Sequence, residues 1–412
     1  MADNQKAARS ALGGAMIIAG TAVGAGMLSI PIATSGVWFA GSIALLVYTW
    51  FCMYVSGLML LECNLHYQEG AGFHTMITDL LGKRWNFING LSILFVLYIL
   101  TYAYISGGSS ILVQHIPSSF GISQPVVGLI FALVVAFIVW LSTKAVDRVN
   151  TILIGAMAIS FVLSVGKIFT AVEPDILLNQ QDAQASYAPY ALAALPYLLA
   201  SFGFHGNIPG LVKYYHKNTR TIIRSLLYGT LFALVIYILW QYVIQGTIPR
   251  QDFKIIIAKG SNVGDLYAQL QSYDLISVFA QQMLTFFGYM ALASSFLGVS
   301  LGLLDYIADF FRFDDSQGGR FKSAVITFLP PIIGGTLFPN GFIYAIGYAG
   351  LAATIWAVIT PALAVYRSRQ RFENTSYRVP GGNLMIAFII LFGIISALAQ
   401  ILAILNLIPV YK

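Results

Sequence analysis

The stretch Gly20-Thr21-Ala22-Val23-Gly24-Ala25-Gly26 decides how the rest of the chain is interpreted. It lies midway along an uncharged apolar segment, residues 10–35, which is long enough to cross a membrane as a helix. Three glycines in seven residues weaken a helix, and backbone groups freed at that depth need polar partners. Such a break is tolerated where it lines a cavity or packs inside protein. We therefore expect this stretch to form half of a small-molecule site at mid-membrane.

The composition of the whole chain is that of a polytopic membrane protein. Its 412 residues are 58% hydrophobic and only 9% charged, with a mean hydropathy of +0.78, whereas soluble domains carry about 25% charged residues. The two cysteines, Cys52 and Cys63, share the second apolar segment and are interpreted as small buried side chains, so we expect no disulfide and no metal site. The net charge of +6 reports membrane topology and indicates no nucleic-acid partner.

Hydropathy divides the chain into apolar segments that predict an all-α protein with eleven transmembrane helices. The segments are 10–35, 37–63, 86–114, 125–143, 150–171, 189–212, 223–246, 275–306, 322–338, 342–366 and 385–407. With the N-terminus inside, only five of the 22 lysines and arginines fall outside the cytoplasmic face: Lys167, Arg250, Lys254, Lys259 and Lys412. The positive-inside rule therefore predicts a cytoplasmic N-terminus and a periplasmic C-terminus.

Two connections are long enough to hold structure of their own. Residues 64–85 have amphipathic spacing that predicts a helix along the inner face of the membrane. Residues 248–274 carry enough apolar side chains to form short helices over an external vestibule, with a well-packed loop as the alternative.

The sixth segment repeats the anomaly of the first. Residues 199–209, LASFGFHGNIP, place two glycines, a histidine, an asparagine and a proline inside an apolar span. Five spans separate the two starts, so the second unit enters the membrane from the opposite side. Discontinuous helices at matching positions of inverted repeats indicate a secondary-transporter site. We expect one domain, 1–412, built of a 5+5 inverted repeat (10–171 and 189–366) with 385–407 as an added eleventh span.

The chemistry of two broken helices fits a zwitterion. The N-terminus of a half-helix offers unpaired amides to a carboxylate, and a half-helix C-terminus offers carbonyls to an ammonium group. An α-amino acid satisfies both ends at once. We expect the carboxylate near the amides of Gly24, Ala25 and Gly26 with Thr21 adding a hydroxyl, and the ammonium near Ala22 and Ser201–Gly203. The alternative is that the glycines only let helices pack closely.

The side-chain pocket is expected to be aromatic. Its candidates are Tyr98, Thr101 and Tyr102 in the third span, Phe202, Gly203 and Phe204 in the sixth, and Phe287 in the eighth. Tyrosine hydroxyls at membrane depth need partners, which favours a polar cavity over lipid. Tyr104 points away from Tyr98 and Tyr102 on a helix and is a weaker candidate. Plain helix packing is the alternative for each aromatic residue.

Few ionisable side chains fall inside the spans, and these are candidates for ion coupling or gating. His205 lies in the sixth-span break, and histidine is the residue type whose ordinary pKa lies near physiological pH, although a structural histidine is an equal alternative. Glu62 and Asp305 lie near the inner ends of their spans, and Ser294 and Ser295 offer hydroxyls to a cation. No nucleophile–base pair, metal cluster, cofactor motif or ATP-binding loop is present, so we expect a secondary transporter and no enzyme.

Six stretches then resemble a known family: AGTAVGAGMLSIP (19–31), WFCMYVSGLMLLE (50–62), YILTYAYIS (98–106), ASFGFHGNIP (200–209), ASSFLGV (293–299) and PNGFIYAIGYAG (339–350). They resemble the bacterial aromatic amino acid permeases of the hydroxy/aromatic amino acid permease family, in the amino acid–polyamine–cation superfamily. The resemblance runs end to end and is greatest to the tryptophan-transporting members. It implies the leucine-transporter type of fold, with substrate between spans 1, 3, 6 and 8.

The resemblance also implies a function. It implies proton symport of L-tryptophan by alternating access across the inner membrane of a Gram-negative bacterium. We expect membrane lipid as the surroundings of the protein and no obligate protein partner. A tyrosine or broad aromatic amino acid symporter is the nearest alternative, and a ligand-binding channel or receptor is a more distant one. Competition by tyrosine and accumulation against a gradient distinguish these.

One departure from the family pattern bears on ion coupling. Family members usually carry a lysine midway along span five, where this chain has Met157, and Lys167 lies ten residues further on. A fixed ammonium in place of a coupling cation is therefore in doubt here. His205, Glu62 or Asp305 would have to take the proton, or the coupling ion differs.

Overall fold

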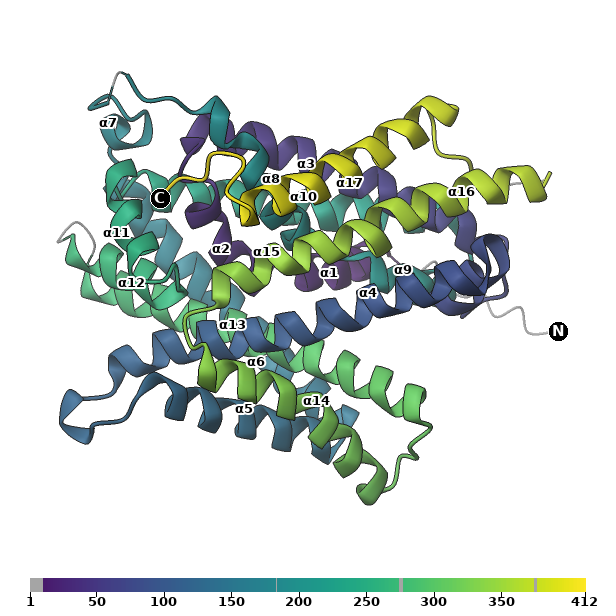
Figure 1. Ribbon diagram of the computed structural model, residues 1–412, viewed down its shortest axis with the longest axis horizontal. Helices are drawn as coiled ribbons and strands as arrows, with labels where there is room; N and C mark the ends of the chain where they lie inside the picture. The colour runs from purple at the N-terminus through teal and green to yellow at the C-terminus, as the bar shows by residue number, and fades with distance from the viewer. Residues whose placement is uncertain (1–9, 183, 274–276, 374–375) are drawn as a thin grey trace.

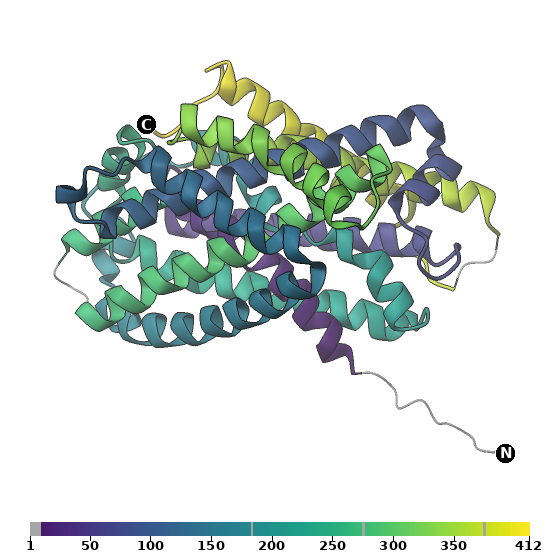
Figure 2. The same ribbon diagram turned by 90° about the horizontal axis from the view of Figure 1, so that it is seen from below.

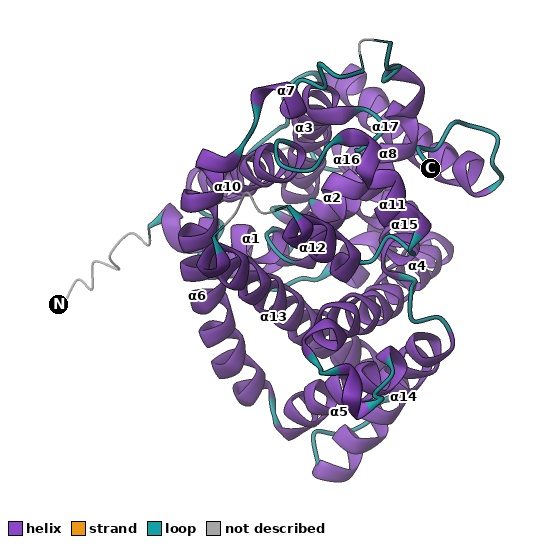
Figure 3. Ribbon diagram, turned by 90° about the vertical axis from the view of Figure 1, so that its left-hand side faces the viewer, coloured by secondary structure: helices purple, strands orange, loops and turns teal. Residues whose placement is uncertain are grey.

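The structure is a computed structural model that describes residues 10–182, 184–273, 277–373 and 376–412. All regular secondary structure in these ranges is helical (Figure 3). The α-helices are α1 Ala11–Ala22, α2 Ala25–Ala33, α3 Trp38–Asn64, α4 Phe73–Leu112, α5 Gln124–Leu141, α6 Thr143–Ile168, α7 Pro174–Leu177, α8 Ala191–Ser201, α9 Ile208–Tyr214, α10 Thr219–Gln245, α11 Phe253–Ala258, α12 Val263–Ser272, α13 Val278–Phe311, α14 Gln317–Leu337, α15 Phe342–Ala353, α16 Thr360–Arg371 and α17 Gly382–Ile404.

Many of these helices have the length and apolarity of membrane spans. Among the described residues, eight helices can cross a membrane, and the bent pair α1–α2 makes a ninth, with 55° between its halves. The long helices run side by side along the longest axis of the molecule (Figure 1). The expected all-α, multi-pass membrane protein is confirmed. The count of eleven spans, the inverted repeat and the membrane orientation stay predictions.

Local sequence signals explain where several elements begin and bend. Ser10 accepts a hydrogen bond from the amide of Leu12 and starts α1, and Asn262 and Asp265 form a reciprocal capping box at the start of α12. Gly82 has φ +86° and separates the amphipathic start of α4 from its apolar part. α4 begins within the connection 64–85, and α11 and α12 lie within 248–274, so helices form in both connections that were expected to hold them.

The broken segment α1–α2 runs into the middle of the molecule. Viewed from below, the first helix crosses the molecule obliquely toward its centre (Figure 2). α1 packs along α10, while α2 contacts α8, α10, α13 and α15. Many of the largest fully buried side chains, including Tyr237, Trp240, Phe202, Phe204 and Phe287, belong to the helices around this point. Large buried side chains thus surround the breaks.

Candidate functional site

The first break is short and made of backbone. α1 ends at Ala22 and α2 begins at Ala25, so only Val23 and Gly24 separate them. A Cβ atom on Gly24 would collide with Ser295 Oγ on α13, and one on Gly26 would lie 3.2 Å from Ser201 Cα on α8. The glycines therefore allow the first break to approach two neighbouring helices more closely than any side chain permits.

The second break is longer and carries side chains. α8 ends at Ser201 and α9 begins at Ile208, and a 3₁₀ turn, η5, covers His205–Asn207 between them. Pro209 lies in the first turn of α9, where its missing amide costs no intrahelical bond. The chain thus leaves helical geometry over residues 202–207 and displays Phe202, Phe204 and His205 there.

Side chains bond the two breaks to each other. Ser201 Oγ donates to the carbonyl of Gly26 at 3.1 Å, and also lies 2.9 Å from the carbonyl of Tyr197. Asn207 Nδ2 donates to Thr21 Oγ1 at 2.7 Å, and that hydroxyl donates to the carbonyl of Ile17 at 2.9 Å. The two discontinuous segments, about 180 residues apart in sequence, therefore form one polar unit.

A tyrosine that the sequence analysis did not single out also joins the breaks. Tyr237, fully buried on α10, places its hydroxyl 2.6 Å from the carbonyl oxygen of Ala22 and 2.6 Å from that of Ser201. These are the last residues of α1 and α8. The signal available in the sequence was a phenol midway along the apolar segment 223–246, where its hydroxyl needs a partner.

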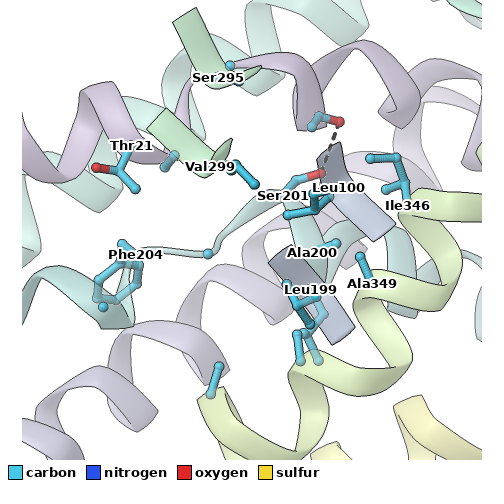
Figure 4. A pocket seen from close by; sticks show the side chains of 18 of the residues that line it. Thr21, Leu100, Leu199, Ala200, Ser201, Phe204, Ser295, Val299, Ile346 and Ala349 are labelled. Carbon is cyan, nitrogen blue, oxygen red and sulfur yellow. Dashed lines mark hydrogen bonds between the residues drawn. The ribbon is translucent and has the colours of Figure 1, made fainter. Parts of the chain in front are cut away.

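A cavity of about 220 Å³ lies between the breaks and α3, α4, α13 and α15. Small-molecule pockets of drug size occupy about 300–1,000 Å³, so this one suits a single small ligand. Its wall is mostly apolar, with Leu199, Ala200, Leu100, Ile346 and Ala349 among the lining residues (Figure 4). The polar exceptions are Thr21, Tyr104, Ser201, Asn207, Ser295 and Trp356.

Seven of the expected substrate-binding residues and one expected gating residue lie on this wall. They are Thr21, Ala22, Gly24, Gly26, Ser201, Gly203, Phe204 and Ser295. The backbone of Ala25 lies at the first position of α2, and its side chain is outside the described part of the structure. The structure thus brings residues of the first, sixth and eighth predicted spans to one cavity (Figure 4).

Other expected residues lie behind the wall. Phe202 packs against Tyr237 with ring centroids 5.0 Å apart, and Phe287 packs against Phe161 and Trp240. Thr101 Oγ1 donates to Leu97 O within its own helix, and Ser294 Oγ donates to Ala291 O in the same way. None of these four side chains is part of the lining of the cavity.

The third-span tyrosines divide between two faces of α4. Tyr98 donates to Ile326 O at 2.9 Å and Tyr102 to Phe338 O at 2.7 Å, so both tie α4 to α14 and the residue after it, beside a separate groove. Tyr104 instead lines the central cavity and is hydrogen-bonded to Ser295. The i, i+4 spacing of Tyr98 and Tyr102 indicated a shared face, but not which face meets the cavity.

His205 lies directly behind Phe204. Its ring stacks on that of Phe204 with centroids 4.6 Å apart and meets the Trp356 ring edge-on at 6.1 Å. The imidazole is fully buried, and neither ring nitrogen has a protein partner in the described part of the chain. Trp356 belongs to η7 (Thr354–Ile359), a π-helical turn between α15 and α16, a type of turn that recurs at functional sites.

The two carboxylates proposed for gating have different surroundings. Glu62 is buried and receives two hydrogen bonds from Arg369, at 2.7 and 2.8 Å, and one from the Val379 amide at 2.7 Å. It therefore ties α3 to α16 and to the segment that precedes α17. Asp305 is exposed on α13, ten residues beyond Ser295. No group of histidine, cysteine, aspartate and glutamate within the described residues has metal-binding geometry.

The bundle of long apolar helices defines a multi-pass membrane protein, and the cavity between its two broken segments is its candidate ligand site. Residues 7–400 match the tryptophan/tyrosine permease family. The chain belongs to this family, so it is a transporter and not an enzyme.

Named relatives cover nearly the whole chain. A tryptophan-specific transport protein of Pseudomonas aeruginosa (strain UCBPP-PA14) is 56% identical over 98% of this chain and 97% of its own length. A low affinity tryptophan permease of Escherichia coli (strain K12) is 45% identical over 99% of both chains. A tyrosine permease of Enterobacter agglomerans is 42% identical over 97% of this chain and 98% of its own length.

Proposed function

We propose that this chain imports L-tryptophan across the bacterial inner membrane by proton symport and alternating access. The observation that carries the proposal is the cavity between two broken helices, which is lined by residues at the C-terminal ends of α1 and α8 and at the start of α2. The relatives named tryptophan-specific transport proteins, at 54–56% identity, support the choice of substrate.

The proposed topology has eleven spans, with the N-terminus cytoplasmic and the C-terminus periplasmic. To the eight long apolar helices and the bent pair α1–α2 we add the second broken segment, α8–α9, and α14. α7, α11, α12 and the C-terminus lie at one end of the long axis, which agrees with a C-terminus on the same side as the predicted outer connection 248–274 (Figure 1). In each proposed repeat the first span is the broken one, and hydrogen bonds join the two broken spans, which supports a site at the interface of two repeats.

The proposed substrate pose follows from the wall of the cavity. The carboxylate binds at the start of α2, because the first amides of a helix have no intrahelical acceptor and carry positive partial charge. The ammonium binds at the carbonyls that end α1 and α8. The indole then lies against the Phe204 ring, with Trp356 beside it and aliphatic side chains of α4 and α15 around it.

The proposed coupling group is His205. It is the expected ionisable residue nearest the cavity, since it stacks on a wall residue, whereas Glu62 is held by Arg369 and Asp305 lies farther along α13. One charge moving through about 100 mV provides ~2.3 kcal/mol, enough for roughly fifty-fold accumulation. Sodium coupling is the alternative for this step.

Uptake by purified protein in liposomes tests the proposal. A pH gradient, acidic outside, is expected to drive tryptophan above its equilibrium concentration, while a sodium gradient alone is not. A channel or receptor would at most equilibrate tryptophan, and sodium-driven accumulation would contradict proton coupling. Excess unlabelled tyrosine and phenylalanine test selectivity: strong competition would favour the broad aromatic carrier that the tyrosine permease relative represents.

A further inference from the structure

The hydroxyl of Tyr237 lies where two half-helices end. It is 2.6 Å from the carbonyl oxygens of Ala22 and Ser201, and these close α1 and α8. A helix C-terminus carries about half a negative elementary charge on its free carbonyls. Two such ends therefore converge on a single neutral hydroxyl.

One hydroxyl does not saturate these acceptors. A phenol donates one hydrogen, while each carbonyl oxygen has two lone pairs. Because both oxygens lie 2.6 Å from the same atom, they can be no farther apart than twice that distance. One ammonium nitrogen, at hydrogen-bond distances of about 2.7–3.0 Å, can therefore contact both at once.

The hydroxyl acts from behind the cavity wall. Ala22 and Ser201 line the cavity, and Tyr237 is absent from its lining. The Phe202 ring packs against the phenol, and Ser201 Oγ donates to Gly26 O in the first turn of α2, so the pair of carbonyls is connected to the start of α2. Ala22 and Ser201 are thus the residues through which a ligand in the cavity would meet this pair of carbonyls.

We propose that Tyr237 is a positioning residue that holds the C-terminal carbonyls of α1 and α8 together as the ammonium subsite. This inference rests on the proposed function and adds a residue from α10 to it. A merely structural tyrosine would stabilise α10 against the breaks and affect all ligands of the cavity equally. A positioning tyrosine affects only ligands that carry an amino group.

The test compares ligands on Tyr237→Phe, which removes one oxygen atom. Dissociation constants are measured for L-tryptophan, for tryptamine, which lacks the carboxylate, and for indole-3-propionate, which lacks the amino group. We expect tryptophan and tryptamine to bind roughly tenfold more weakly, with indole-3-propionate changed by less than about twofold. Tyr215→Phe is the matched control, because this buried tyrosine donates to Ser10 O at the far end of α1, and we expect it to leave all three constants unchanged.

Each outcome decides the matter. Equal losses for the three ligands, or no loss, would overturn the positioning role while tryptophan binding by the unmodified protein upholds the proposed function. An unmodified protein that binds no tryptophan would overturn both. If Tyr237→Phe is not recovered from membranes, the same ligands are measured on Phe202→Leu, which loosens the ring that seats the phenol. There too, the losses must be confined to the ligands with an amino group.

Discussion

The two breaks both interrupt a membrane-length helical segment, but they do so with different kinds of residue. Between α1 and α2 the helix is interrupted over two residues, Val23 and Gly24, and neither supplies a polar side chain. Between α8 and α9 it is interrupted over residues 202–207, which include two phenylalanines, a histidine and an asparagine. The first break contributes backbone to the cavity, and the second contributes the Phe204 ring and the Asn207 amide.

The glycines of the two breaks differ in what surrounds them. A Cβ atom on Gly24 would collide with Ser295, whereas one on Gly203 would come no closer than 3.4 Å to Ala200 O. A Cβ on Gly206 would meet no atom within 4 Å. The comparison indicates that the first break is fixed by neighbouring helices, while the second has room for substitution at its glycines.

The largest expected effect is a loss of tryptophan binding on substitution of Gly24, the glycine that the neighbouring helix confines. Gly24→Val should abolish detectable tryptophan binding while the protein remains folded in the membrane, because the new side chain must displace Ser295 and the α2 amides with it. Binding is measured by isothermal titration and folding by size-exclusion chromatography.

Two controls separate the loss of binding from a general glycine effect. Gly210→Ala and Gly20→Ala, both outside the lining of the cavity, should retain affinity within about twofold, since their added methyl groups meet open space or only Ile154 Cδ1 at 4.0 Å. Wild-type affinity in Gly24→Val would remove the first break from the site.

The next effect tests the rings of the second break. Phe204→Ala should weaken tryptophan binding by ~1–3 kcal/mol, or about 5–150-fold, if the ring stacks on the indole. Phe287→Ala is the matched control, because this equally buried ring packs behind the wall against Phe161 and Trp240. It should lower thermal stability without altering affinity. Unchanged affinity in Phe204→Ala would leave the indole on another surface.

Much of this architecture was predictable because it depends on patterns within single segments. Glycines inside an apolar span predicted the first break, and a similar pattern of glycines and polar residues at Ser201–Asn207 predicted the second. The length of the apolar segments predicted the long helices, and amphipathic spacing in residues 64–85 predicted the start of α4. Such signals are local, so they survive without knowledge of tertiary contacts.

The wall of the cavity was harder to predict, since it depends on how helices rotate against each other. Tyr104 faces the cavity while Tyr98 and Tyr102 face α14, and only packing decides between these faces. Trp356 reaches the wall from a π-helical turn, which shifts its direction relative to an ordinary helix. Tyr237 bonds to residues 215 and 36 positions away, a pairing that no local pattern contains.

A third variant sharpens the role of the histidine in the second break. His205→Gln should retain tryptophan binding within about threefold, because the imidazole lies behind Phe204, and should lose accumulation driven by a pH gradient. Counterflow between equal tryptophan pools, which requires no coupling, is the control and should persist. Full proton-driven accumulation by His205→Gln would exclude this histidine as the coupling group and turn attention to Asp305.

The smallest expected effect is that of removing the Tyr98 hydroxyl, which lies on the face of α4 turned away from the cavity. Tyr98→Phe removes a hydroxyl that donates to Ile326 O, so it should cost about 1 kcal/mol of stability and leave tryptophan affinity within about twofold. The thermal unfolding midpoint and the dissociation constant report these two quantities separately. Tyr104→Phe, on the cavity side of the same helix, is its counterpart and should weaken binding more than it lowers stability, since its hydroxyl shares Ser295 with the first break.

Comparing these two variants therefore shows which face of α4 meets the ligand. If Tyr98→Phe lowers affinity and Tyr104→Phe does not, the face of α4 that meets the ligand is the one turned toward α14. The indole would then lie outside the space between the two breaks. The substrate site would no longer combine backbone from the first break with a ring from the second. The opposite result keeps the ligand between Gly24 and Phe204, where the two kinds of break face each other.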